Sequence, residues 1–442
     1  MARIVFIGAG SAGIIRNALA AAVTAVALMA TGCGSAAKEQ ASGPVQITIW
    51  HGQTDAAAKS IEKLVTQFNQ GHPEIKVNIE PGAATADGML PKLTAALTSD
   101  AYPDIAYLYG SWAPNIARNP KTADLTESVK DPAVGWADFW ASERAAATVE
   151  GKVVGFPAVV DNMVVLYNKK LLAKAGIEAP KPDWTWDDFR AIAKKTTDAG
   201  SGTFGATWAI SGGEEAVWGL WPLIWQAGGD VLSPDRKKAV FNSAAGQQAL
   251  GLLRGMAIDD KSLYLDSSPA EKGQKLFESG RLGMFLSGPW VLPDLQAAKI
   301  DYGVAQLPGT NGNHETVSGP DNWVVFTHDE RRVKAATTFL AWLTAADQQL
   351  EWMKDTGSLP IRESIAKLPG YQDYLKKYPG IEVISGNLAN AKRVRPPTTR
   401  YPRVSAFVAE AIAQTLLGKA DPKTALDEAA AKADAALAVP GS

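Results

Sequence analysis

The sequence predicts an α/β fold with a mostly parallel sheet, in a chain long enough for two domains. The chain has 442 residues, and a chain of this length can bury two separate cores. Apolar residues alternate at period two in short segments such as 46–50 (QITIW), and they recur at helical spacing in the segments between. Strand, helix and strand in that order, joined by short turns, are typical of βαβ units.

The first set of elements begins after residue 44. Strands are predicted at 46–50, 75–79 (IKVNI) and 104–109 (DIAYLY), with helices at 56–68 and 89–97 between them. A second set follows the turn at 155–157 and begins with a strand at 163–167 (MVVLY). Thr185, with Asp188 three residues later, predicts the start of a helix through a capping box.

The rest of the chain is predicted to be mainly helical. Helices are expected at 214–227, 244–256 and 269–279, followed by strands at 282–286 and 302–306. After Arg331, helices are expected at 335–342, 347–354 and 404–417.

The amino terminus carries a motif whose context is missing. Residues 3–17 (RIVFIGAGSAGIIRN) have glycines at GxGxxG spacing, which is typical of a dinucleotide-binding turn. That motif requires an amphipathic helix and an acidic residue about 20 residues further on, whereas residues 17–35 contain no charged residue. Arg3 and Arg16 instead precede an apolar run of roughly 14 residues that ends in small residues, which is the order of a secretory signal.

Residues 30–33 (ATGC) resemble the lipobox of bacterial lipoproteins, and this resemblance implies cleavage before Cys33 and acylation of its thiol. We therefore expect a signal peptide over 1–33 that ends at the acylated Cys33, followed by a flexible tether over 34–44. The protein would be exported and held at the extracytoplasmic face of the cell membrane through its lipid alone.

Composition excludes several classes of function. Cys33 is the only cysteine, so neither an intrachain disulfide nor a thiolate metal cluster is possible. A net charge of −2 provides no basic field for nucleic acid. The four histidines lack metal-ligand spacing, and no GxSxG motif occurs. We expect no metal, no cofactor, no nucleic-acid partner, no catalysis and a monomeric chain.

Six segments in order carry a resemblance to a known family: QITIWHG, PDIAYLYGSW, EGKVVGFPAVVDNMVVLYNKKLLAKAG, FESGRLGMFLSGPW, DYGVAQLPG and GSLPIRES. They resemble the extracellular solute-binding proteins (family 1 type) of bacterial ABC importers, in the group that serves sugars and glycerol phosphodiesters. The resemblance implies a two-lobe, periplasmic-binding-protein-like (Venus flytrap) fold of class II type, with a ligand cleft between the lobes.

The same resemblance implies how the chain is divided. The N-terminal lobe would comprise 45–154 plus 305–365, and the C-terminal lobe 155–304 plus 366–442. Two to three segments would cross between the lobes and form the hinge, near 155–159 and 303–305 and after Ile365.

Candidate ligand-binding residues lie at strand ends and on one helix face. Trp50 and His51 end the first strand, and Tyr109 and Trp112 end the third, so both pairs point to the same rim of a parallel sheet. Trp290 follows a Ser-Gly-Pro turn at a strand end, where a stacking role is favoured.

Other candidates have alternative interpretations. Trp218 and Trp225 share a helical face with Trp221, where core packing competes with ligand stacking. Packing, turn capping or surface charge are the alternatives for the remaining candidates, which are Asp161, Asn162, Asp321, Asn322, Trp323, Arg362 and Arg395. Either arginine would suit a phosphate on the ligand.

These observations predict a lipid-anchored receptor that captures a mono- or oligosaccharide between its lobes. It would deliver the sugar to the transmembrane permease subunits of an importer driven by a cytoplasmic ATPase. A ligand of the glycerol phosphodiester or sugar phosphate type is the first alternative. A secreted glycoside hydrolase with paired carboxylates, an oxidoreductase and a cell-wall adhesin are the alternatives from other classes.

Overall fold

The computed structural model describes residues 43–211, 213–267 and 271–439. The predicted signal peptide, Cys33 and nearly all of the predicted tether lie outside these ranges. The strands are β1 (Val45–His51), β2 (Ile75–Pro81), β3 (Ile105–Tyr109), β4 (Thr148–Val149), β5 (Lys152–Val153), β6 (Gly155–Val159), β7 (Val164–Asn168), β8 (Ala206–Ala209), β9 (Leu263–Asp266), β10 (Met284–Ser287), β11 (Tyr302–Ala305) and β12 (Asp321–Val325).

The α-helices lie mostly between and after these strands. They are α1 (Asp55–Gly71), α2 (Met89–Thr98), α3 (Ala113–Ala117), α4 (Ala141–Ala146), α5 (Lys169–Lys174), α6 (Trp186–Thr196), α7 (Gly213–Trp218), α8 (Leu220–Gln226), α9 (Ala244–Arg254), α10 (Glu271–Glu278), α11 (Leu292–Ala297), α12 (Glu330–Leu343), α13 (Ala346–Thr356), α14 (Tyr371–Lys377), α15 (Ile381–Asn387), α16 (Tyr401–Leu416) and α17 (Pro422–Leu437).

Two sheets carry most of the strands, and their directions correct the sequence-based expectation. The larger sheet has the order β2-β1-β3-β12-β6. β1 is parallel to β2 and β3, but β12 is antiparallel to both β3 and β6. The sheet β10-β7-β11 is antiparallel throughout. The prediction of a mostly parallel sheet is therefore wrong outside β1–β3 and the β8–β9 pair. A helical crossover makes two consecutive strands parallel, but it does not set the direction of a strand that enters the sheet from a distant part of the chain.

Most elements begin and end close to where the sequence predicts them. The capping box at Thr185 is confirmed, with the Thr185 side chain and Asp188 each bonding the other's backbone N–H. The single helix predicted at 214–227 is wrong, because α7 ends at Trp218 and α8 begins at Leu220. Pro222 lacks the N–H that would bond back to the carbonyl of Trp218, so the helix is interrupted there.

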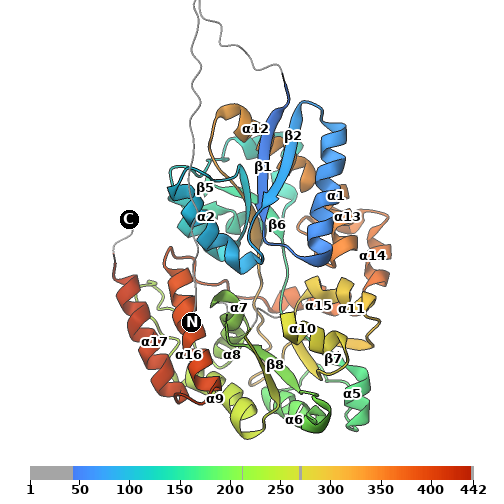
Figure 1. The fold of residues 1–442 in the computed structure, drawn as a ribbon, viewed down its shortest axis with the longest axis vertical. Coiled ribbons are helices and arrows are strands. Elements are labelled where there is room, and N and C mark those ends of the chain that lie inside the picture. Colours follow the sequence, from blue (N-terminus) through green and yellow to red (C-terminus); the bar gives the residue numbers. More distant parts are fainter. Residues whose placement is uncertain (1–42, 212, 268–270, 440–442) are drawn as a thin grey trace, which may run out of the picture. The chain divides into compact units, whose positions relative to one another are not determined.

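Segments far apart in the sequence pack against the first sheet. Figure 1 shows α1 along β2, with α13 from the later part of the chain beside α1. The rings of Phe68 on α1 and Phe339 on α12 meet edge to face, with centroids 4.9 Å apart. The helices α16 and α17 lie side by side. Within the described ranges, no helix is both long enough and apolar enough to cross a membrane.

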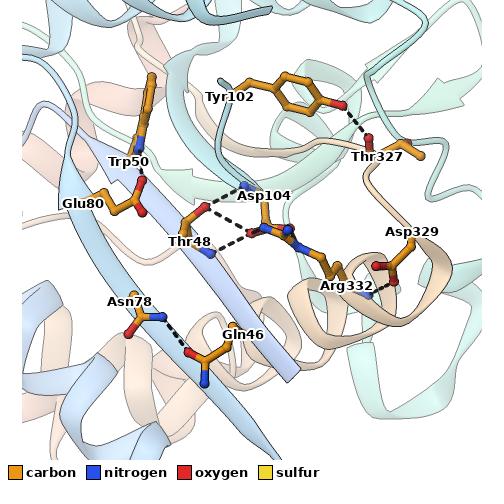
Figure 2. Close-up of polar contacts among 10 residues, drawn as sticks. All are labelled: Gln46, Thr48, Trp50, Asn78, Glu80, Tyr102, Asp104, Thr327, Asp329 and Arg332. Carbon is orange, nitrogen blue, oxygen red and sulfur yellow. Dashed lines mark hydrogen bonds and ion pairs between the residues drawn. The ribbon is translucent and has the colours of Figure 1, made fainter. Parts of the chain in front are cut away.

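A buried carboxylate joins β1, β3 and α12. Asp104 accepts hydrogen bonds from the Thr48 backbone N–H at 2.7 Å and from Arg332 Nε at 2.7 Å and Nη2 at 2.6 Å (Figure 2). The Asp104 side chain is 1% exposed. Asp329 accepts the backbone N–H of Arg332 and caps α12. This network fixes the start of β3, whose other end reaches the candidate site.

Candidate functional site

Three strand ends meet at one edge of the five-stranded sheet. Asp321, the first residue of β12, pairs in register with Tyr109 at the end of β3 and with Val159 at the end of β6. Because β12 runs antiparallel to both neighbours, its start lies beside their ends. Asp161 follows β6, and its carboxyl interacts electrostatically with that of Asp321. The fold thus brings together three predicted residues that lie far apart in the sequence.

Carboxyl side chains gather around this edge, and we refer to five of them as the acidic cluster: Asp87, Glu143, Asp161, Glu214 and Asp321. All are buried except Asp87, which is partly buried. The charge of Glu214 acts on both Asp87 and Asp321, and the charge of Asp321 acts on both Asp161 and Glu143. The cluster is therefore one electrostatic unit.

Arg395 supplies positive charge to the acidic cluster. Its Nη1 donates to Glu214 Oε1 at 2.8 Å, and both side chains are 4% exposed. The Tyr401 hydroxyl donates to the same oxygen at 2.9 Å, and Trp221 Nε1 donates to that hydroxyl at 2.9 Å. The guanidinium also lies 5.7 Å from the ring centroid of Tyr109. Burial is the largest single influence on the pKa of Arg395 and lowers it, but the charges of Glu214, Tyr401 and Asp321 and the hydrogen bond to Glu214 together raise the pKa above its usual value.

Four carboxyl groups of the cluster, those of Asp87, Glu143, Asp161 and Asp321, have raised pKa values and hold their protons to unusually high pH. Burial raises the pKa of Asp87 to about 6, with a further rise from Glu214. Burial also raises the pKa of Asp321 to about 7 and that of Glu143 to about 8. The pKa of Asp161 lies well above its usual value because of burial and the neighbouring Asp321. Near neutral pH the cluster can therefore both donate and accept hydrogen bonds.

An aromatic pair lies next to the cluster. The rings of Trp218 and Trp290 are 5.5 Å apart between centroids, with an interplanar angle of 49°. Trp290 is 41% exposed, and Trp218 is partly buried. A Cβ at Gly288 would collide with the Trp290 ring, so only glycine allows the ring this position. Glu214 precedes Trp218 by four residues on α7, which places both on one helix face.

The residues predicted at the end of β1 lie in local contacts. Trp50 is buried, and its Nε1 donates to Glu80 Oε2 at 3.0 Å (Figure 2). The ammonium of Lys92 lies 4.7 Å from the centroid of the Trp50 ring. Burial lowers the pKa of His51, whose Nδ1 accepts the backbone N–H of Gln53. Trp50 Nε1 and His51 Nδ1 are thus occupied locally, whereas His51 Nε2 is buried without a hydrogen-bond partner among the described residues.

Two predicted amide side chains connect backbone segments. Asn162 donates from Nδ2 to the Ile384 carbonyl at 2.9 Å, and its Oδ1 accepts from Asn387 at 2.8 Å. It is fully buried. Asn322 Nδ2 donates to the Ala146 carbonyl at 3.1 Å. The amide nitrogen and the amide oxygen of Asn162 therefore each have a partner on α15, which is the environment of a structural side chain.

The Arg362 side chain donates hydrogen bonds to backbone carbonyls in other parts of the chain. It donates to the carbonyls of Val134 and Gly135 at 2.9 Å and also to that of Thr344. Its guanidinium lies 3.7 Å from the ring centroid of Phe139. Burial lowers its pKa to about 10. This environment is that of a structural arginine.

The remaining predicted tryptophans pack in the interior. Trp323 meets Tyr107 edge to face at 5.3 Å and is 3% exposed, which fits its alternative interpretation as a packing residue. Trp225 is 1% exposed on α8, beside the fully buried Trp221, and its alternative interpretation as a packing residue fits this placement. Trp112 is likewise buried.

Four residues of the site were not among the sequence-based candidates: Asp87, Glu143, Glu214 and Tyr401. Glu214 carries a detectable signal, because it lies one helical turn before a candidate tryptophan. Asp87 lies on the 3₁₀ turn Ala86–Gly88, and nothing in its local pattern separates it from other surface aspartates. Across the described residues, no group of three or more His, Cys, Asp or Glu side chains is arranged to hold a metal ion.

Residues 63–380 match the family described as bacterial extracellular solute-binding protein. The chain is 26% identical over 405 residues to a putative binding protein of Brucella abortus, with 90% of this chain and 94% of the relative covered. It is also 26% identical over 426 residues to the sn-glycerol-3-phosphate-binding periplasmic protein UgpB of Brucella melitensis, with the same coverage of both chains.

Solved structures of solute-binding proteins share the fold of this chain. The cyclic α-maltosyl-1,6-maltose binding protein of Arthrobacter globiformis is 30% identical with a TM-score of 0.72, covering 89% of this chain and 99% of that one. An ABC transporter solute-binding protein of Thermotoga lettingae, solved with α-D-tagatose, is 25% identical with a TM-score of 0.80, covering 89% of this chain and 100% of that one. The chain therefore belongs to the bacterial extracellular solute-binding proteins and has their two-lobe α/β fold.

Proposed function

We propose that this protein captures an uncharged mono- or oligosaccharide between its lobes and delivers it to the transmembrane subunits of an ABC importer. The observation that carries the proposal is the Trp218–Trp290 pair, in which Trp290 is exposed and Trp218 lies one helical turn from the buried Glu214. The C–H faces of a sugar ring stack on indole rings, and its hydroxyls require hydrogen-bonding partners such as carboxyl groups. The solved relatives from Arthrobacter globiformis, which binds cyclic α-maltosyl-1,6-maltose, and Thermotoga lettingae, solved with α-D-tagatose, support the same ligand class.

The mechanism follows from the predicted division of the chain into lobes. Asp87, Tyr109 and Asp321 belong to the predicted N-terminal lobe, whereas Glu214 and Trp290 belong to the C-terminal one. A ligand held by residues of both lobes gains its full set of contacts only in the closed form. Ligand binding therefore shifts the population towards the closed form. A shift from mostly open to mostly closed requires a differential of about 5 kcal/mol, which stacking and several hydrogen bonds supply.

Isothermal titration of the purified full-length chain with maltotriose, cyclic maltosyl-maltose and D-tagatose tests this function. Saturable heat with at least one of these sugars is expected, without product after prolonged incubation. Release of smaller sugars during the incubation would point to a glycoside hydrolase. Absence of binding to every saccharide would overturn the proposed ligand class.

A phosphorylated polyol is the second candidate, favoured by the name of the Brucella melitensis relative. The sequence offered Arg362 and Arg395 as partners for a phosphate. Arg362 donates to backbone carbonyls and Arg395 to Glu214. The electrostatics of the site therefore favour the uncharged sugar.

The membrane anchor is a further part of the proposal. As a member of an extracellular family the protein is exported, and we infer that acylated Cys33 holds it at the outer face of the membrane. In cells fed radiolabelled palmitate, the unaltered protein should carry label and sediment with membranes, whereas the Cys33→Ser variant should not be labelled. An unlabelled, freely released wild-type protein would contradict the anchor.

A further inference from the structure

The acidic cluster combines five carboxyl groups with one arginine, Arg395. The positive charge of Arg395 partly offsets the rise in the pKa values of Asp87, Asp161 and Asp321. Its direct ion pair is with Glu214, at 2.8 Å and out of contact with water. Its positive charge is thus already offset by Glu214, and little of it is left to attract an anionic ligand.

The Arg395–Glu214 pair is held in place from a third side. Glu214 Oε1 also accepts from Tyr401, which in turn accepts from Trp221 Nε1. Turning the guanidinium towards a ligand phosphate would leave Glu214 Oε1 with the tyrosine alone and a buried, unpaired charge. Leaving a buried carboxylate unpaired is strongly unfavourable.

The same oxygen set suits ligand hydroxyls. Glu214 Oε2 and Glu143 Oε2 are buried and accept no hydrogen bond from the described residues. A sugar hydroxyl can donate to such an oxygen, whereas a phosphate oxygen bears no proton to donate when it is fully ionised. A phosphate here would therefore meet unpartnered acceptor oxygens beside an arginine that is already paired with Glu214.

We propose that Glu214 is a specificity-determining residue, which makes this site reject phosphorylated ligands by neutralising Arg395. The inference rests on the proposed function in assigning the ligand site to this cluster, and it names the charge class of the ligand. It also separates this chain from a relative whose name specifies sn-glycerol 3-phosphate.

The test is a gain of anion binding. Glu214→Gln keeps the shape and the acceptor for Tyr401 but removes the charge that pairs with Arg395. Titration with sn-glycerol 3-phosphate and with inorganic phosphate should show no saturable binding to the wild-type chain at millimolar concentration. The variant should bind at least one of them roughly tenfold or more tightly than wild type does, because an unpaired arginine is a strong phosphate partner.

Two matched variants show whether the gain arises at this pair. Glu214→Gln combined with Arg395→Gln should lose the gained binding. Asp260→Asn removes one negative charge from another partly buried pair, in which Asp260 accepts from Arg190 at 2.5 Å, and it should not gain phosphate binding. Thermal unfolding followed by circular dichroism checks that each variant is folded.

The wild-type measurement keeps the inference falsifiable if Glu214→Gln fails to fold. Tight binding of sn-glycerol 3-phosphate by wild type, above that of every tested saccharide, would overturn the inference and leave a solute-binding function standing. A folded Glu214→Gln chain with unchanged phosphate affinity would overturn it as well. Failure of wild type to bind any saccharide or phosphate would instead contradict the proposed function.

Discussion

The ring of Trp290 packs against that of Trp218 at 5.5 Å while remaining 41% exposed. Trp290 follows β10 in the Pro289–Val291 turn, and Trp218 ends α7, so two separate elements form one aromatic surface. An exposed indole with one buried neighbour is a surface that a ligand can complete. The pair is therefore the natural stacking platform of the proposed site.

We predict that Trp290→Ala weakens saccharide binding by more than roughly tenfold, the loss expected for one stacking contact with its desolvated area. Titration calorimetry with the sugar that binds wild type measures the change. Trp140→Ala is the matched control, since Trp140 is 39% exposed and donates to the Pro360 carbonyl. Unchanged affinity in Trp290→Ala would remove Trp290 from the site.

We predict that Arg362→Met lowers the free energy of unfolding by about 2–4 kcal/mol, because it leaves buried carbonyls without a donor. The dissociation constant for the sugar should stay within about twofold, because the Arg362 contacts are with Val134, Gly135 and Thr344. Urea unfolding and titration calorimetry measure the two quantities. Arg118→Met, which breaks an exposed ion pair with Glu150, is the control. A large loss of affinity at unchanged stability would place Arg362 in the ligand site.

Local patterns in the sequence predict the elements of this fold but not the direction of every strand. The period-two segments at 46–50 and 75–79 correspond to β1 and β2, and the capping box at Thr185 starts α6 as expected. The partners of β12 are β3 and β6, both more than 150 residues earlier in the chain. No local pattern reports such a pairing, and this is why the antiparallel half of the larger sheet was missed.

The candidate site shows the same limit. Strand ends and a turn before Trp290 are local features, and they led to Tyr109 and Trp290 but equally to Trp50 and Trp112, which are buried. Arg362 and Arg395 look alike in sequence, yet one bonds backbone carbonyls and the other pairs with Glu214. Only the tertiary contacts separate a structural arginine from one at the site.

Burial of Glu143 makes stability depend on pH. An unfolded Glu ionises near 4.5, whereas the folded Glu143 holds its proton up to a pKa of about 8. Between these values the folded state binds more protons than the unfolded state, so stability falls as pH rises. The free energy of unfolding that Glu143 alone removes over this pH range amounts to as much as about 5 kcal/mol, at about 1.4 kcal/mol per pH unit.

We predict that Glu143→Gln reduces this fall, because a glutamine cannot ionise. Urea unfolding at pH 5 and pH 8 should show a smaller loss of stability in the variant than in wild type. A residual slope remains, since the pKa values of Asp87 and Asp321 are raised in the same direction. Identical slopes in the two proteins would contradict a protonated Glu143 in the fold.

Breaking the Asp104–Arg332 pair should lower stability mainly because it leaves the buried Asp104 carboxylate unpaired. Arg332→Met leaves the Asp104 carboxylate, 1% exposed, without its two guanidinium donors. Breaking a buried pair from one side costs about 3–5 kcal/mol, and because Arg332 is 31% exposed we expect a loss at the lower end of that range. Asp104→Asn with Arg332→Met should cost less than the sum of the single changes, because the uncompensated charge is then gone. Urea unfolding of the four proteins measures the coupling. Lys63→Met is the control, because it breaks a more exposed pair with Glu351, and it should change stability by less than about 1 kcal/mol. If the effects of the Asp104 and Arg332 changes were additive, the pair would be no stronger than such a surface contact.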